Sequence, residues 1–167
     1  MRTMNRGFQA LCMWILLIVV DQLSKFWVLA ALKGKGSVPV IKGVFELLYV
    51  ENRGAAFGIL QNRQWIFLLI GAVILLALLW LFPKLPEEKH FLALKICCVL
   101  IGAGAVGNMI DRLFRGYVVD FLYFKLIDFP VFNVADIYVT TASFALVLLI
   151  LFVYREEDFD KIFSKRA

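Results

Sequence analysis

The sequence predicts an all-α membrane protein with four transmembrane helices and a small extracytoplasmic β-sheet and loop region. Hydrophobic residues make up 62% of the chain and charged residues only 19%, whereas soluble proteins average roughly 45–50% apolar and about 25% charged residues. Four apolar stretches are also long enough to cross a bilayer core, which takes about 20 residues of helix. The 167 residues are expected to form one domain, residues 1–167.

The four predicted spans carry few charges. In chain order they are Phe8–Leu32, Trp65–Phe82, Phe91–Ile110 and Ile137–Tyr154. The second and fourth contain no charged residue, and the third contains only Lys95, whose stem can lie along lipid while its ammonium group reaches the interface. The first span follows Arg2 and Arg6 and resembles a signal peptide. Because no small-residue cleavage site is clear, we interpret it as a retained helix.

The distribution of basic residues predicts that both termini are cytoplasmic. Lys and Arg are denser near the termini and in the 83–90 connection than in the two long connections, as the positive-inside rule requires of the inner face. Residues 33–64 and 111–136 then lie outside. In the first of these segments, β-branched and aromatic residues bounded by Pro39, Gly43 and an Asn52-Arg53-Gly54 turn predict short strands.

Charge and rare residue types exclude several classes of function. The formal net charge of +5 comes from residues that flank the spans, so membrane lipids are expected partners and nucleic acid is not. The three cysteines lie inside apolar runs and predict neither disulfides nor a metal site, and we expect no cofactor. The single histidine, His90, lies in the predicted cytoplasmic connection. No Ser-His or Cys-His pair can therefore form on the outer face.

One run of residues matches a nucleotide-binding pattern without its context. Residues 102–107 spell GxGxxG, but they lie within an apolar span and not between a strand and a helix. Ala103 and Gly107 instead place small residues on one face of the span, at a spacing that allows close helix packing. We interpret the run as a helix-packing surface.

Two aspartates are the strongest candidates for catalysis. Asp120 and Asp136 each lie among apolar neighbours with no adjacent cation, a setting that disfavours ionisation. Both belong to the connection between the third and fourth spans, so they can meet at the outer interface. Two carboxylates held close share one proton, which allows one to activate water and the other to donate to a carbonyl oxygen. Helix caps or surface acids remain the alternative interpretation.

Other polar residues lie in or next to the spans. Asp21 and Lys25 are spaced i and i+4 in the first span, where we expect a buried structural ion pair more than a catalytic role. Asn108 and Arg112 share one face at the end of the third span. They belong either to a functional site or to a polar helix end that meets water.

Five segments taken together resemble the bacterial lipoprotein signal peptidases, the type II signal peptidases of the aspartyl intramembrane protease family. These segments are Asp21–Lys25, Asn52–Phe57, Gly107–Arg112, Val118–Phe121 and Phe132–Asp136. The resemblance implies a multi-pass endopeptidase of the bacterial cytoplasmic membrane. Such an enzyme removes the signal peptide from diacylglyceryl-modified prolipoproteins by an aspartate-dyad mechanism at the extracytoplasmic interface.

The resemblance also implies roles for individual residues. Asp120 and Asp136 match the catalytic dyad, and the substrate-binding or supporting residues are Asn52, Gly54, Asn108, Arg112, Asn133, Asp21 and Lys25. The β-rich segment 33–64 would cradle the lipidated substrate, and 111–136 would form the catalytic connection. We expect a monomer.

Two other classes of protein are alternatives to a protease. A small transporter or proton channel could use Asp21 and Lys25, but such proteins usually show internal repeats, and none is visible in the sequence. A structural membrane scaffold would give no reason for paired aspartates.

Overall fold

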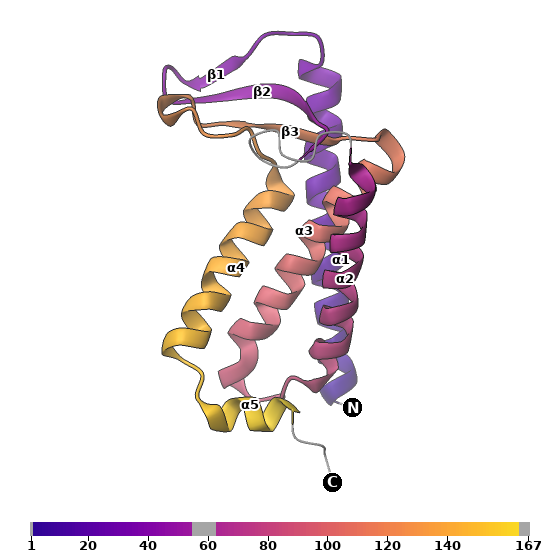
Figure 1. Ribbon diagram of the computed structural model, residues 1–167, viewed down its shortest axis with the longest axis vertical. Helices are drawn as coiled ribbons and strands as arrows, with labels where there is room; N and C mark the ends of the chain where they lie inside the picture. The colour runs from indigo at the N-terminus through magenta and orange to yellow at the C-terminus, as the bar shows by residue number, and fades with distance from the viewer. Residues whose placement is uncertain (1, 55–62, 164–167) are drawn as a thin grey trace.

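The computed structural model describes residues 2–54 and 63–163. Four long helices run side by side and a small sheet covers one end of them (Figure 1). The helices are α1 (Arg2–Leu32), α2 (Gln64–Leu81), α3 (Leu92–Arg115) and α4 (Val134–Phe152). Each belongs to a segment long and apolar enough to span a membrane. The predicted fold class is therefore confirmed.

The helix boundaries differ from the predicted ones where α3 ends and α4 begins. Helix α3 continues through Arg115 and ends at Gly116, whose φ of 75° is the left-handed conformation that glycine adopts readily. Helix α4 begins at Val134 because Asn133 and Asp136 form a capping box, in which each side chain accepts the other's backbone N–H. Asp136 therefore lies in the first turn of α4 and not in a loop.

The sheet has three antiparallel strands in the order β1-β2-β3. Strands β1 (Val38–Ile41) and β2 (Phe45–Asn52) lie in the segment where strands were predicted, whereas β3 (Val118–Tyr123), in the connection between α3 and α4, was not predicted. Val50 of β2 is paired with Asp120 of β3. This register brings the end of β2 against the strand that carries one candidate catalytic residue.

Buried apolar residues fix β3 against α1. Val119 and Phe121 of β3 pack with Val28 and Leu32 of α1 in one core cluster beneath the sheet. Because side chains alternate along a strand, Asp120 points away from that cluster. The apolar packing therefore decides which way the carboxyl group faces.

Small residues let α3 lie close to its neighbours. A Cβ atom on Gly104 would come within 2.5 Å of the Ala135 carbonyl oxygen of α4, and one on Gly107 would collide with the Asp21 carboxylate of α1. Ala103 is fully buried. The GxGxxG run is thus a helix-packing surface within α3, as interpreted from the sequence.

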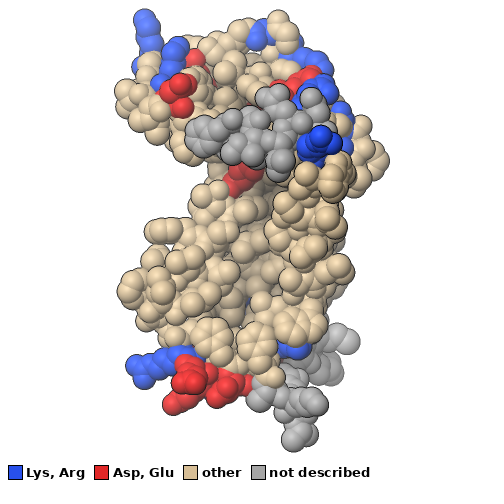
Figure 2. Space-filling view, in the orientation of Figure 1, with Lys and Arg blue, Asp and Glu red and all other residues tan. Residues whose placement is uncertain are grey.

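Charged residues gather at the two ends of the molecule. Figure 2 shows Lys, Arg, Asp and Glu mainly at the sheet end and at the opposite end, separated by a broad band of other residues. The opposite end carries α5 (Glu156–Phe163), a short helix that the sequence analysis did not predict. There, His90 Nε2 lies 3.1 Å from Asp158 Oδ2. This separation of charges agrees with a membrane crossing between the two ends.

Candidate active site

Asp120 and Asp136 meet through a shared asparagine. Asn133 donates from Nδ2 to Asp120 Oδ1 at 2.6 Å. Its backbone N–H donates to Asp136 Oδ2 at 3.2 Å, and its Oδ1 accepts from the Asp136 backbone N–H at 3.0 Å. Asp120 is 1% exposed, whereas Asp136 is partly exposed. The structure therefore brings the two predicted dyad residues to one place, between β3 and the start of α4.

Two further asparagines complete the hydrogen bonds of the aspartates. Asn52 Nδ2 donates to Asp120 Oδ2 at 2.8 Å, and Asn108 Nδ2 donates to Asp136 Oδ1 at 2.8 Å. The Gly54 N–H donates to Asn52 Oδ1 at 3.0 Å, which fixes the orientation of that amide. Each carboxyl group thus accepts two donors, one from Asn133 and one from another asparagine.

Burial shapes the acidity of Asp120. Removal from solvent raises its pKa to about 7, and repulsion from Asp136 acts in the same direction. The donors Asn52 and Asn133 and the charge of Lys25 oppose this change. Asp120 therefore titrates near neutral pH, where a general acid is most effective.

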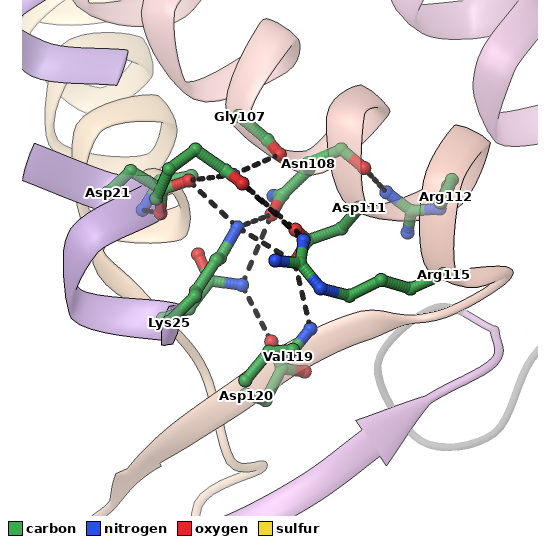
Figure 3. A network of polar contacts seen from close by, with 12 residues as sticks. Asp21, Lys25, Gly107, Asn108, Asp111, Arg112, Arg115, Val119 and Asp120 are labelled. Atoms are coloured by element: carbon green, nitrogen blue, oxygen red, sulfur yellow. Dashed lines mark hydrogen bonds and ion pairs between the residues drawn. The ribbon is translucent and has the colours of Figure 1, made fainter. Parts of the chain in front are cut away.

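A buried ionic cluster lies directly beside these residues. Figure 3 shows Lys25 reaching from α1 toward Asn108 and Asp111 of α3. Its Nζ lies 2.9 Å from Asp21 Oδ2, 3.2 Å from Asp111 Oδ2 and 2.9 Å from Asn108 Oδ1. The three charged side chains are 0% exposed. The expected Asp21–Lys25 ion pair is present, and it continues through Asn108 to Asp136.

Asp111 joins three parts of the fold. Besides Lys25 of α1, it accepts from Arg115 one turn later in α3 and from the backbone N–H of Val119 at 3.0 Å. Val119 immediately precedes Asp120, so this bond ties the strand that carries Asp120 to α3. Although Arg112 is adjacent to Asp111 in the sequence, the cations that pair with Asp111 are Lys25 and Arg115.

Arg112 closes the site toward the segment that follows β2. Its Nη1 donates to the Asn108 carbonyl oxygen at 3.4 Å and its Nη2 to the Gly54 carbonyl oxygen at 3.5 Å. The guanidinium carbon lies 4.6 Å from the centre of the Phe67 ring. Arg112 Nε is buried without a hydrogen-bond partner among the described residues.

The family model described as signal peptidase (SPase) II matches residues 13–152. The chain belongs to the signal peptidase II family. Among its relatives, the lipoprotein signal peptidase of Clostridioides difficile (strain 630) is 46% identical over 138 residues, which cover 83% of this chain and 91% of the relative. That of Streptococcus pyogenes serotype M5 (strain Manfredo) is 38% identical over 145 residues, covering 87% and 92%.

Two solved structures of bacterial membrane enzymes share the fold of this signal peptidase II. One, determined by the in meso method at 2.3 Å resolution, has a TM-score of 0.75 and 29% identity, covering 95% of this chain and 93% of that one. The other, at 1.9 Å resolution, has a TM-score of 0.76 and 30% identity, covering 87% and 94%. The protein is thus an aspartic endopeptidase with a bacterial multi-pass membrane fold, and not a transporter or scaffold.

The structure of this signal peptidase II places every predicted site residue within one connected region. Ala55–Phe57, part of one motif, lie outside the described residues. Sequence reasoning missed three members of the buried cluster: Gln22, Asp111 and Arg115. The i, i+4 spacing of Asp111 and Arg115 was a usable signal for an ion pair. Nothing in the sequence indicated that Gln22 would reach across to α3.

Proposed function

We propose that this signal peptidase II removes the signal peptide from diacylglyceryl-modified prolipoproteins, with Asp120 and Asp136 as its water-activating dyad. The observation that carries the proposal is their shared contact with Asn133. Two neighbouring carboxyl groups that share one proton provide a base and an acid at the same pH. The relatives' shared name, lipoprotein signal peptidase, supports the class of substrate.

The chemistry needs only water and the two carboxyl groups. The ionised aspartate accepts a proton from water as the water oxygen attacks the scissile carbonyl carbon, and the protonated aspartate donates to the carbonyl oxygen. The resulting diol collapses when the first aspartate protonates the leaving nitrogen and the second recovers a proton from a diol hydroxyl. The C–N bond breaks, and the dyad returns to its starting state.

The surrounding residues support this reaction without taking part in bond changes. Asn52, Asn108 and Asn133 orient the carboxyl groups through the hydrogen bonds described above. Arg112 supports the segment that follows Asn52 through its contacts with the Asn108 and Gly54 carbonyl oxygens. Gly54 lets the chain turn beside Asn52 and holds its amide.

The active site is proposed to lie at the extracytoplasmic interface, with both termini in the cytoplasm. A substrate anchored by a signal helix and lipid chains has to be cut near the bilayer surface, where water reaches the site. In Figure 2, acidic atoms reach the surface in the narrow waist just below the sheet end. We further propose that the enzyme acts as a monomer and contacts membrane lipids along its apolar band.

A cell-free cleavage assay with purified protein tests this function. Asp120→Asn and Asp136→Asn should bind lipidated prolipoprotein while cleavage falls by several orders of magnitude, and the double variant should be little worse than either alone because the two residues act as a unit. Asp128→Asn is the matched control, since Asp128 is an exposed acid bound to Tyr123 and asparagine also tolerates its left-handed backbone. Cleavage by either dyad variant at near the parental rate would contradict the proposal. Unlipidated prolipoprotein should be a poor substrate.

A further inference from the structure

The two aspartates have different electrostatic surroundings. Asp136 lies in the first turn of α4, where the helix dipole favours a negative charge. Its other oxygen accepts from Asn108, whose own oxygen contacts the Lys25 ammonium group. Asp120 lies on a strand, is 1% exposed, and accepts from two amides without a direct cation contact among the described residues. The charged form is therefore better supported at Asp136.

Lys25 and Asn133 together fix which way the Asn108 amide faces, because the Asn108 amide oxygen accepts from Lys25 Nζ at 2.9 Å and from Asn133 Nδ2 at 3.2 Å. An ammonium group can only donate hydrogen bonds, so its 2.9 Å contact requires the amide oxygen of Asn108 to face it. The amide nitrogen must then face Asp136, to which it donates at 2.8 Å. Asp21 and Asp111 hold the ammonium group in place from the other side.

We propose that Lys25 is a positioning residue which, through Asn108, makes Asp136 the ionised, water-activating member of the dyad and Asp120 the protonated member. This inference rests on the proposed function and assigns its two roles. Asp136 takes the proton from the attacking water and later gives it to the leaving nitrogen. Asp120 gives its proton to the carbonyl oxygen and recovers one from the diol.

Other charged or titratable groups face the same region and stay in place in the test below. They are Asp111, Arg112 and Arg115 of α3 and Tyr138 of α4. Arg115 neutralises Asp111 independently of Lys25. Removing Lys25 together with Asp21 therefore deletes one positive and one negative charge and leaves Asp111 paired.

The decisive experiment compares pH profiles of kcat/KM for the full-length enzyme in detergent or lipid. In Asp21→Asn, Lys25→Met, Asn108 lacks its cation and donates more weakly to Asp136, while Asn133 Nδ2 still contacts its amide oxygen. The dyad should then take up its first proton at higher pH. The acidic limb of the profile, where activity falls as pH decreases, should move up by roughly half to one pH unit. This is less than the 1–3 pKa units that a directly contacting charge produces. Lys95→Met, which removes an ammonium group near the start of α3 that contacts Glu87, should leave the limb unmoved.

The outcomes separate this inference from the proposed function. An acidic limb at the parental pH in the double variant, with both dyad asparagine variants inactive, overturns the role of Lys25 alone. Parental cleavage by the dyad variants would overturn the proposed function instead. A structural role for Lys25 would lower the rate equally at every pH.

Infrared spectroscopy provides a second test that does not require the double variant to fold. Between the two limbs, the parent should show the carbonyl band of one protonated aspartic acid, and Asp120→Asn should lose it because Asp136 remains ionised. Persistence of that band in Asp120→Asn would place the proton on Asp136 and refute the assignment.

Discussion

Replacing Asn52 by alanine should move the alkaline limb of the pH profile upward. Asn52 Nδ2 donates to Asp120 Oδ2 at 2.8 Å, and this bond opposes the rise of the Asp120 pKa to about 7. The donor stabilises the ionised form more than the protonated form. Its loss should therefore raise the pKa of Asp120 further, so that the acid stays protonated and competent at higher pH.

The size of the change follows from the difference between two hydrogen bonds. A bond to a charged group contributes about 1.5–3 kcal/mol and a neutral one about 0.5–1.5 kcal/mol, so ionised Asp120 loses about 1 kcal/mol more than its protonated form. At about 1.4 kcal/mol per pKa unit, the alkaline limb should move by roughly 0.7 units. Asp120 is only 1% exposed, so water can replace little of the lost bond.

The assay is the cleavage rate of lipidated prolipoprotein across neutral and alkaline pH. Glu51→Gln is the matched control: it alters the neighbouring residue on β2, whose carboxylate binds Lys33 and Arg53 instead of Asp120. The control should keep the parental limb. An unmoved alkaline limb in Asn52→Ala, whatever its maximal rate, would show that Asp120 is not the acid that controls it.

Three further predictions concern stability and topology. Because burial raises the pKa of Asp120 from its ordinary 3.8 to about 7, the fold loses stability as pH rises between these two values and loses no more above about 7; Asp120→Asn should therefore raise Tm relative to the parent more at pH 8 than at pH 5. Gly104→Ala should lower Tm and reduce the free energy of unfolding by about 1–3 kcal/mol, because its Cβ would meet a backbone carbonyl oxygen of α4. Gly7→Ala is the control and should not lower Tm, because the space around Gly7 is open. In a background without native cysteines, Lys125→Cys should react from outside intact cells with an impermeant thiol reagent and Pro86→Cys should not; labelling at position 86 would reverse the proposed orientation.

Membrane-spanning helices were predictable because lipid imposes one dominant requirement on them. A bilayer core demands a long apolar stretch, and all four appear in the structure. Helix ends depend on local backbone bonds that hydropathy does not report. Helix α3 ends at Gly116 and α4 starts after the Asn133 capping box, and both positions differ from the predicted ones. Asp136 therefore lies in a helix and not in the preceding connection.

The sequence could single out the two proposed dyad residues because acids are rare in apolar surroundings, whereas it could not predict the contacts that hold them. Asp120 and Asp136 stood out as acids without adjacent cations. The tie between Asp111 and the Val119 backbone requires β3 to lie beside α3. Single-sequence patterns give no such pairing, because strand register depends on contacts between distant segments.

The Asp136 carboxyl group, proposed to take part in the reaction, also holds the start of a helix. It accepts the Asn133 N–H that starts α4, and Asn133 in turn holds Asp120. In the proposed mechanism this carboxylate takes a proton during turnover and becomes a weaker acceptor for that N–H. The N-terminal cap of α4 would then weaken and re-form in each cycle, so that the start of a membrane helix responds to the position of a single proton.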